Sequence, residues 1–302
     1  MSDLKKGSAV KGIFLALAAA LAVSNVYIFS KAALKEVHIA QFGVYWFGLG
    51  IIWNLIYIFV FGKQRGLKKL SGNTWLVLLL IAVLEMFGTV LFFMAINKVE
   101  NPAVVSFLAN INPLLITTLG ILMLHEKFNG TEFLGMIITL TGAVMISYKG
   151  GASLSKLFIP GTEYVWLSGI IYSFSSVIAK KNIAKIDPSF LAMARILLLF
   201  VLSLVMVLSL GLSFKIPVSA FKNVAIGSVL GPFLTALLGY LSMKYIEVSK
   251  ASIVRSVRSL FVLTGAYIYF GSFPTQIQII GGLFTISGVI FISLGKLKKR
   301  QN

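Results

Sequence analysis

The sequence contains no cysteine, only two histidines and few charged residues. The absence of cysteine excludes a disulfide framework, a thiolate metal site and a thiol nucleophile. The histidines, His38 and His125, lie far apart in the chain, and the apolar segments contain no pair of carboxylates. The phosphate-binding loop GxxxxGK[ST] of ATP-driven proteins is also missing from the sequence. We therefore expect a protein that is not an enzyme and that holds no cofactor and no metal.

Charged residues make up 12% of the 302 residues, whereas hydrophobic residues make up 58%. A soluble domain of this length could not cover so much apolar surface, so the composition predicts a polytopic membrane protein. The net charge of +18 would suit a nucleic-acid-binding protein, but the lysines lie mostly between apolar runs. Basic residues in such places set topology and contact anionic lipids. We therefore expect membrane lipids as partners and no nucleic acid.

Ten apolar segments follow one another, each about 20 residues long, the length that crosses ~30 Å of hydrocarbon. We interpret the first, from Gly12 onward, as a membrane helix and not as a cleaved signal peptide. With the N-terminus in the cytoplasm, 17 lysines and arginines fall in cytoplasmic connections and 6 in outer ones. Because basic residues favour the cytoplasmic side, we expect a multi-pass protein of a bacterial-type cytoplasmic (inner) membrane with both termini cytoplasmic. The segments span residues 11–34, 39–61, 74–96, 102–123, 131–149, 162–182, 188–210, 222–243, 249–270 and 275–295.

The two halves of the chain resemble each other. At an offset of 149 residues, SKAALKEVHIAQF (30–42) aligns with AKKNIAKIDPSFL (179–191), and at an offset of 146, residues 124–147 align with 270–293. Each half holds five helices, and because five is odd, the halves enter the membrane from opposite sides. The sequence thus predicts an all-α integral membrane fold of ten transmembrane helices, built as two five-helix inverted-topology repeats over residues 10–150 and 160–296. The identical pairs in the second block are Gly135 with Gly281, Thr139 with Thr285, Gly142 with Gly288 and Ser147 with Ser293.

The end of each half resembles a known family. The segment AINKVENPAVVSFLANINPLLITTLGILMLHEKFNGTEFLGMIITLTGAVMIS (95–147) and its weaker copy at 243–293 are similar to the EamA type of the drug/metabolite transporter superfamily. In that family, a proline near the middle of helix four is followed by a Gly-Glu or similar pair and a glycine-containing fifth helix. The second half departs from this pattern, since Ser259 stands where proline is common. The resemblance covers nearly the whole chain and implies a ten-helix transporter, without implying a substrate. The matching residues are Pro113, His125-Glu126, Gly135 and Gly142.

Three arginines lie within predicted membrane helices, Arg255 and Arg258 in the ninth and Arg195 in the seventh. A charge at the centre of a bilayer costs about 2.5–3.5 kcal/mol on insertion scales. Arg255 and Arg258 are three residues apart and share a helix face. Arg255 could instead extend to the cytoplasmic surface, whereas Arg258 would have to reach across most of a leaflet. Because planar guanidinium groups suit carboxylates and phosphates, we expect the three arginines to bind an anionic or zwitterionic solute.

Polar residues also share one face of the fourth helix. Ser106, Asn110 and Pro113 recur there at helical spacing, and Ser256 lies on the corresponding part of the ninth helix. Pro113 lacks a backbone donor, so it frees the carbonyl of Ala109 and predicts a kink. In one interpretation this face binds the solute, and Asn110 and Ser106 orient it. In the other, the small and hydroxyl-bearing residues serve helix packing.

Glu85 is the only carboxylate deep within a predicted helix, the third. It could form an ion pair with Arg258 or Arg195, take up a proton as the coupling ion, or face a small wet cavity without a function. The repeat places Trp46 opposite Arg195, and we expect Trp46 and Tyr172 on the wall of the cavity. Further candidates for this wall are Asn25, Tyr27, Tyr45, Ser173 and Ser176.

Lys31 lies near the outer end of the first helix and aligns with Lys180 near the inner end of the sixth. A long lysine side chain at a helix end commonly extends to the membrane surface, and we expect Lys31 to do so. In the alternative, the symmetric pair lines the two mouths of a pathway.

These observations predict a secondary transporter that moves a small organic solute by alternating access around a site near the membrane midplane. The expected solute is an amino acid, an organic acid or a phosphorylated metabolite. The alternative is a flippase of the same fold, in which the arginines face a lipid-linked headgroup. Both a monomer and a homodimer are compatible with the sequence.

Overall fold

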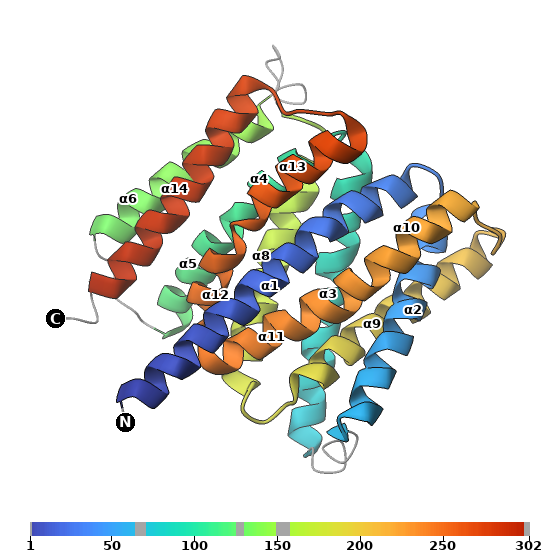
Figure 1. The fold of residues 1–302 in the computed structure, drawn as a ribbon, viewed down its shortest axis with the longest axis horizontal. Helices are drawn as coiled ribbons and strands as arrows, with labels where there is room; N and C mark the ends of the chain where they lie inside the picture. The colour runs from blue at the N-terminus through green and yellow to red at the C-terminus, as the bar shows by residue number, and fades with distance from the viewer. Residues whose placement is uncertain (1, 64–70, 125–129, 149–157, 299–302) are drawn as a thin grey trace.

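The computed structural model describes residues 2–63, 71–124, 130–148 and 158–298, and these are mainly helical (Figure 1). In this part of the chain, β pairing is limited to one bridge between Tyr148 and Phe158. The ten predicted segments correspond to ten elements, of which the fourth, eighth and ninth consist of consecutive helical pieces. In chain order they are α1 (Ser2–Leu34); α2 (Ile39–Val60); α3 (Gly72–Lys98); α4 (Pro102–Leu108), η2 (Ala109–Ile111) and α5 (Asn112–Leu124); α6 (Gly130–Ser147); α8 (Thr162–Asn182); α9 (Pro188–Ser209); α10 (Val218–Ser228), η3 (Val229–Thr235) and α11 (Ala236–Tyr245); α12 (Val248–Arg255) and α13 (Arg258–Phe270); and α14 (Gln276–Lys298).

The helices have the length and composition of membrane spans. Large apolar side chains such as Phe59, Leu76 and Ile268 are exposed on the outer faces of the bundle, where lipid tails would contact them. This confirms the predicted all-α integral membrane fold. Five described stretches are long and apolar enough to cross a bilayer alone, namely Val10–Leu34, Ile39–Val60, Gly72–Lys98, Pro188–Ser209 and Val218–Tyr245, and shorter apolar helices cover Pro102–Ile116, Phe133–Ser147 and Gln276–Ile292.

The connection before α9 shows how the sequence starts a helix. The side chain of Asp187 accepts a hydrogen bond from the backbone N–H of Ser189, and Pro188 occupies the first helical position. Asp187 also lies 3.5 Å from Nζ of Lys63, which follows α2. Partial burial would raise the pKa of Asp187, but the donors of Ser189 and the positive charges of Lys63 and Lys244 outweigh it, so its pKa lies below its ordinary value.

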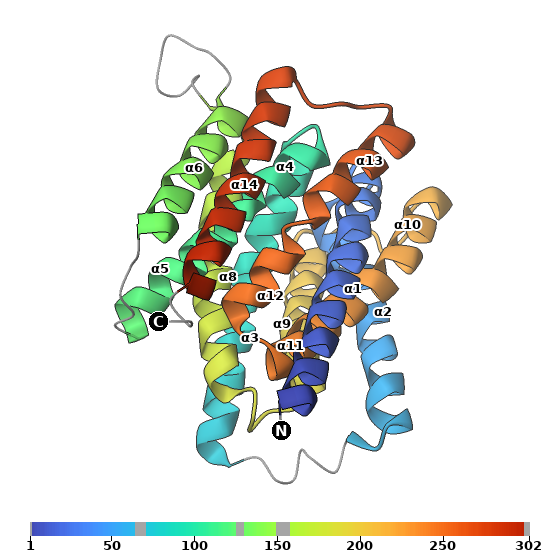
Figure 2. The same ribbon diagram turned by 60° about the vertical axis from the view of Figure 1, so that its left-hand side comes forward.

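Two groups of helices form the centre of the protein. In the first group, α1 packs against α10, η3, α11, α12 and α13; in the second group, α8 packs against α3, α4, η2 and α5. The first helix of each half therefore packs mainly on the other half. Two helix pairs, α2 with α9 and α6 with α14, flank these groups at opposite edges of the bundle (Figures 1 and 2).

The pair α6 and α14 shows the inverted repeat most directly. A methyl group added at Gly135 would lie 2.7 Å from the carbonyl oxygen of Gly288, and one added at Gly142 would lie 2.5 Å from that of Gly281. Residues near the start of one helix thus meet residues near the end of the other, so the two run antiparallel. The glycines that the repeat aligns are the ones that let the two backbones approach.

The fourth and ninth helices break at equivalent places. In the fourth, the α-helix ends at Leu108 and resumes at Asn112 after a short 3-10 turn, as Pro113 predicts. In the ninth, α12 ends at Arg255 and α13 begins at Arg258, although no proline stands there (Figure 2). The break is thus a property of both halves, and in the second half it forms without a proline.

Lys31 is buried and Lys180 is partly buried, and the expectation that Lys31 extends outward is wrong. Its side chain is only 5% exposed, and Nζ lies 2.9, 2.9 and 2.7 Å from the carbonyl oxygens of Ile96, Asn97 and Val99. These carbonyls end α3 and have no partner within the helix, so the ammonium group satisfies them. Lys180 does the same for α11, with Nζ 2.6 and 3.0 Å from the carbonyl oxygens of Met243 and Ile246.

Candidate functional site

A cavity lies between the two helix groups, with α2 and α9 closing one side. The cavity has a volume of about 160 Å³, roughly ten times the ~10–15 Å³ that one water needs. The cavity therefore has room for a small organic solute. Its polar lining residues are Tyr27, Glu85, Thr89, Asn112, Ser168, Tyr172, Ser173, Ser176, Arg195, Thr235, Tyr240, Arg255 and Arg258.

Glu85 and Arg195 form a buried ion pair on one wall. Oε2 of Glu85 lies 3.5 Å from Nη1 of Arg195, and Oε1 accepts a hydrogen bond of 2.7 Å from the hydroxyl of Ser175. The two charged side chains are only 8% and 16% exposed. Of the partners considered for Glu85, the structure thus selects Arg195. Each carboxylate oxygen of Glu85 thus already has one partner within the protein.

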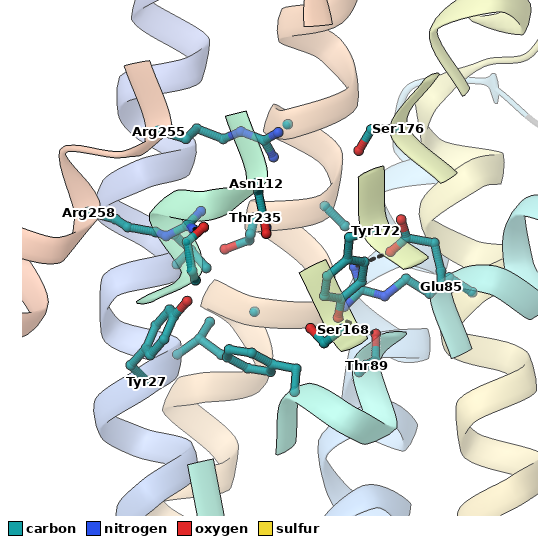
Figure 3. A pocket seen from close by; sticks show the side chains of 18 of the residues that line it. Tyr27, Glu85, Thr89, Asn112, Ser168, Tyr172, Ser176, Thr235, Arg255 and Arg258 are labelled. Carbon is teal, nitrogen blue, oxygen red and sulfur yellow. Dashed lines mark hydrogen bonds and ion pairs between the residues drawn. The ribbon is translucent and has the colours of Figure 1, made fainter. Parts of the chain in front are cut away.

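A pair of hydroxyl groups lies next to this ion pair. The hydroxyl of Tyr172 on α8 is 2.8 Å from Oγ1 of Thr89, one helical turn after Glu85 on α3. Both side chains line the cavity. They join α3 to α8 within the second helix group and leave the aromatic ring of Tyr172 on the cavity wall (Figure 3).

Arg255 and Arg258 enter the cavity from the other side, across from Glu85, Thr89 and Tyr172 (Figure 3). They stand on either side of the break between α12 and α13, which places both guanidinium groups on the same wall. Neither residue extends to the surface, so the alternative considered for Arg255 does not hold in this structure. Among the described residues, neither forms an ion pair.

Arg258 is held by the opposite half of the protein. Its Nη2 donates a hydrogen bond of 3.0 Å to the carbonyl oxygen of Ala109. This is the carbonyl that Pro113 frees, because Pro113 has no N–H to give to it. The Tyr27 hydroxyl points toward the same guanidinium group (Figure 3). The helix break of one half therefore positions the arginine of the other.

The polar face of the fourth helix lies at a helix crossing and not on the cavity wall. Asn110 is fully buried, and its Nδ2 donates to the hydroxyl of Ser259 at 2.9 Å. Ser259 in turn donates to the carbonyl oxygen of Ser106 at 3.0 Å. Pro113 and Ser256 are buried beside them and are absent from the cavity lining. The structure corrects the interpretation in which Ser106 and Asn110 orient the solute. Asn110 of η2 bonds Ser259 of α13, and the hydroxyl of Ser106 donates to the carbonyl oxygen of Ala103 within α4.

Other predicted wall residues do reach the cavity. Trp46 is 1% exposed, lines the cavity and packs on Gly227 and Gly231 of the eighth element, where any larger residue would collide with its ring. Tyr27, Tyr172, Ser173 and Ser176 line it as well, whereas Asn25 and Tyr45 do not. Tyr45 bonds the backbone of Phe214 instead.

Several wall residues were missing from the sequence-based prediction, namely Thr89, Asn112, Ser168, Thr235 and Tyr240. Two signals could have found them. Thr89 follows Glu85, and Ser168 precedes Tyr172, by four residues, so each shares a helix face with a predicted site residue. The repeat offset of 146 also pairs Thr89 with Thr235 and Asn112 with Arg258.

The described residues contain no group of three or more histidine, cysteine, aspartate or glutamate side chains that could hold a metal ion. The chemistry of the cavity is therefore that of guanidinium, hydroxyl and amide groups around one carboxylate.

Comparisons with known proteins agree with this architecture. An "Uncharacterized transporter" of Methanothermobacter thermautotrophicus is 24% identical over 232 residues, which cover 76% of this chain and 68% of that protein. An "Uncharacterized transporter" of Archaeoglobus fulgidus is 26% identical over 282 residues, 87% of this chain and 90% of that protein. The "Uncharacterized inner membrane transporter YhbE" of Escherichia coli is 26% identical over 161 residues, 53% of this chain and 49% of that protein.

A solved structure titled "Crystal structure of protein" superimposes with a TM-score of 0.67 over 99% of both chains at 17% identity, and it supports the fold. The model of the EamA-like transporter family matches residues 10–148 and again residues 160–294. Since that family model accounts for nearly the entire chain, once in each half, the protein belongs to the EamA-like transporter family and is a multi-pass membrane transporter.

Proposed function

We propose that the protein is a secondary transporter that carries a small organic anion or zwitterion across the cytoplasmic membrane by alternating access. The cavity between the two helix groups supports this most directly, because Arg255 and Arg258 face Glu85, the ion-pair partner of Arg195, across it. In transporters built from inverted repeats, the solute site lies where the halves meet. Guanidinium groups in a site of low dielectric bind carboxylates and phosphates strongly.

Each cavity residue then has a defined role. Arg255 and Arg258 bind the negative group of the solute, and the carbonyl of Ala109 fixes the direction of Arg258. Glu85 keeps Arg195 neutralised while the site is empty. Trp46 and Tyr172 supply aromatic walls for the rest of the solute.

Movement of the two helix groups against each other opens the cavity to one membrane face at a time. The sequence has no ATP-binding loop, so solute gradients, proton gradients or exchange drive the cycle. The excess of basic residues in alternate connections supports a cytoplasmic location for both termini.

Uptake into proteoliposomes tests the function. We expect a radiolabelled organic anion to enter vesicles that contain the wild-type protein, and to be excluded when Arg258→Gln replaces it. Lys215→Gln is the matched control, because Lys215 is an exposed basic residue outside the cavity. Equal uptake by Arg258→Gln and wild type would refute the site, and scrambling of labelled lipids without solute uptake would favour the flippase.

A further inference from the structure

The charges in the cavity do not balance. Among the described lining residues, three side chains are cationic, Arg195, Arg255 and Arg258, and Glu85 alone is anionic. Glu85 is committed to Arg195 through one oxygen and to Ser175 through the other. Two guanidinium groups therefore face the cavity without a counter-charge from the described chain.

These two guanidinium groups have incomplete hydrogen bonding. Nε of Arg255 and Nε of Arg258 are both buried without a hydrogen-bond partner among the described residues. The carbonyl oxygen of Ala109, to which Arg258 donates, carries no net charge. Burial of a charge is costly unless it is paired, so the empty cavity favours a ligand that supplies negative charge.

The cavity also disfavours a zwitterion. The one carboxylate on the described wall is already paired with Arg195, so it leaves no unpaired negative charge for the ammonium group of an amino acid. The ammonium group would also lie close to Arg255 and Arg258, whose charge repels it. A ligand with two negative charges has neither difficulty.

Resting on the proposed function, we propose that the solute is a dianion, a phosphate monoester or a dicarboxylate, bound by Arg255 and Arg258 together. The two arginines stand on one wall, separated only by the break between α12 and α13, so they can contact one doubly charged group or two neighbouring carboxylates. Arg195 remains paired with Glu85 on the opposite wall.

Matched ligands test the charge of the solute. Thermal shift and calorimetry on the purified protein would compare succinate with its monoamide, and glycerol 3-phosphate with its methyl diester, since a bound ligand raises apparent stability. We expect one dianion to bind at least about tenfold more tightly than its monoanionic match, equivalent to about 1.4 kcal/mol. Arg255→Gln and Arg258→Gln should each abolish this preference, and Lys215→Gln should keep it.

The outcomes separate the two proposals. If monoanions and dianions bind equally, or if glutamate binds more tightly than succinate, the dianion inference fails and an anion transporter remains. If no anion binds and an amine or a neutral solute does, the proposed function fails as well.

A second inference comes from Lys31 and Lys180, whose ammonium groups bond helix-ending carbonyls. Lys31 belongs to α1 of the first helix group and bonds the end of α3 in the second group. Lys180 belongs to α8 of the second group and bonds the end of α11 in the first group. The first contact lies at the membrane face where α1 ends, and the second at the face where α1 begins.

We infer that the two lysines act as opposed latches between the helix groups, one at each face. Opening at the face where α1 ends separates Lys31 from the carbonyls of Ile96 and Val99, and opening at the other face separates Lys180 from those of Met243 and Ile246. Both latches are closed in the structure. Alternating access then requires that one latch stay closed while the other opens.

Distance measurements between spin labels test the latches without a transport assay. The chain has no cysteine, so pairs can be introduced directly at Lys35 and Glu163 for one face and at Lys181 and Lys244 for the other. Lys31→Met should lengthen the first distance and leave the second unchanged, and Lys180→Met should do the reverse. Lys31→Arg, which keeps the donors, should retain more of the closed distance. A variant that elutes as a monodisperse, folded protein and changes neither distance, or both equally, would overturn the inference.

Discussion

Nη2 of Arg258 donates to the carbonyl oxygen of Ala109, so a charged residue of the second half completes the helix break of the first. Pro113 prevents that carbonyl from bonding within its own helix. The break and the arginine are therefore one functional unit, although they lie in different halves of the chain.

Replacement of Pro113 tests this unit. Pro113→Ala restores a backbone donor that competes with Arg258 for the carbonyl of Ala109, so we expect anion affinity to fall at least about fivefold, or about 1 kcal/mol. The melting temperature should not fall along with the affinity, because alanine suits a helix interior. Pro188→Ala is the control, since Pro188 occupies the first turn of α9. Titration calorimetry measures the anion affinity of both variants, and unchanged affinity in Pro113→Ala would contradict the prediction.

The ion pair of Glu85 and Arg195 should show strong coupling. Removal of one partner of a buried pair costs about 3–5 kcal/mol because it leaves the other charge uncompensated. We expect Glu85→Gln and Arg195→Gln each to lower the melting temperature, and the double variant to recover much of the loss.

The exposed pair of Lys98 and Glu163 provides a matched control, in which the same two single variants and the double variant are measured as a double-mutant cycle. Its side chains are 49% and 50% exposed and lie 3.6 Å apart, and exposed pairs contribute about 0–1 kcal/mol. Denaturation of both sets of variants in the same detergent compares them. Equal coupling energies in the two cycles would show that the Glu85–Arg195 pair is not sheltered as the structure indicates.

The glycine crossing of α6 and α14 should tolerate no side chain. The methyl group of Gly142→Ala would lie 2.5 Å from the carbonyl oxygen of Gly281, and overpacking costs about 1–3 kcal/mol. Gly72→Ala is the control, since no atom lies within 4 Å of the added methyl group. We expect a lower yield of folded, monodisperse protein for Gly142→Ala alone, and comparable yields would contradict the close approach.

The stability of the protein should depend on Asp187 at acidic pH. Its pKa is lowered in the folded state, so its charge stabilises the fold above the ordinary aspartate value of about 3.9, and the effect is lost as pH falls through the folded-state pKa. Asp187→Asn keeps a helix-capping side chain and removes the charge. We expect the variant to melt below wild type at pH 7 and the difference to shrink below about pH 4. A difference that persists at low pH would point to the cap and not to the charge.

The sequence allowed the fold to be predicted well because hydrophobic length and internal repetition do not depend on helix rotation. The glycines paired by the repeat, such as Gly135 with Gly281, lie at the α6–α14 crossing in the structure. The arginine pair of the ninth helix was also evident, because charge in an apolar run is rare.

The rotation of each helix about its axis and the positions of the helix breaks were harder to predict. Asn110 lies at a helix spacing that fits both a cavity wall and a helix crossing, and only its contact with Ser259 decides between them. The burial of Lys31 depends on the carbonyls at the end of α3, which no hydropathy pattern reveals. The break before Arg258 has no proline to announce it, and we have no local sequence account of it.

The exchange of first helices between the halves has a consequence for assembly. Because α1 packs on the eighth and ninth elements, and α8 on the third and fourth, neither five-helix unit can bury its own faces or close a cavity alone. A single such unit would bury its faces only by packing against a second, inverted copy of itself. The fused chain is in this sense a domain-swapped dimer whose two subunits are joined covalently, and its central cavity exists only after the last helices to be synthesised have closed around the first.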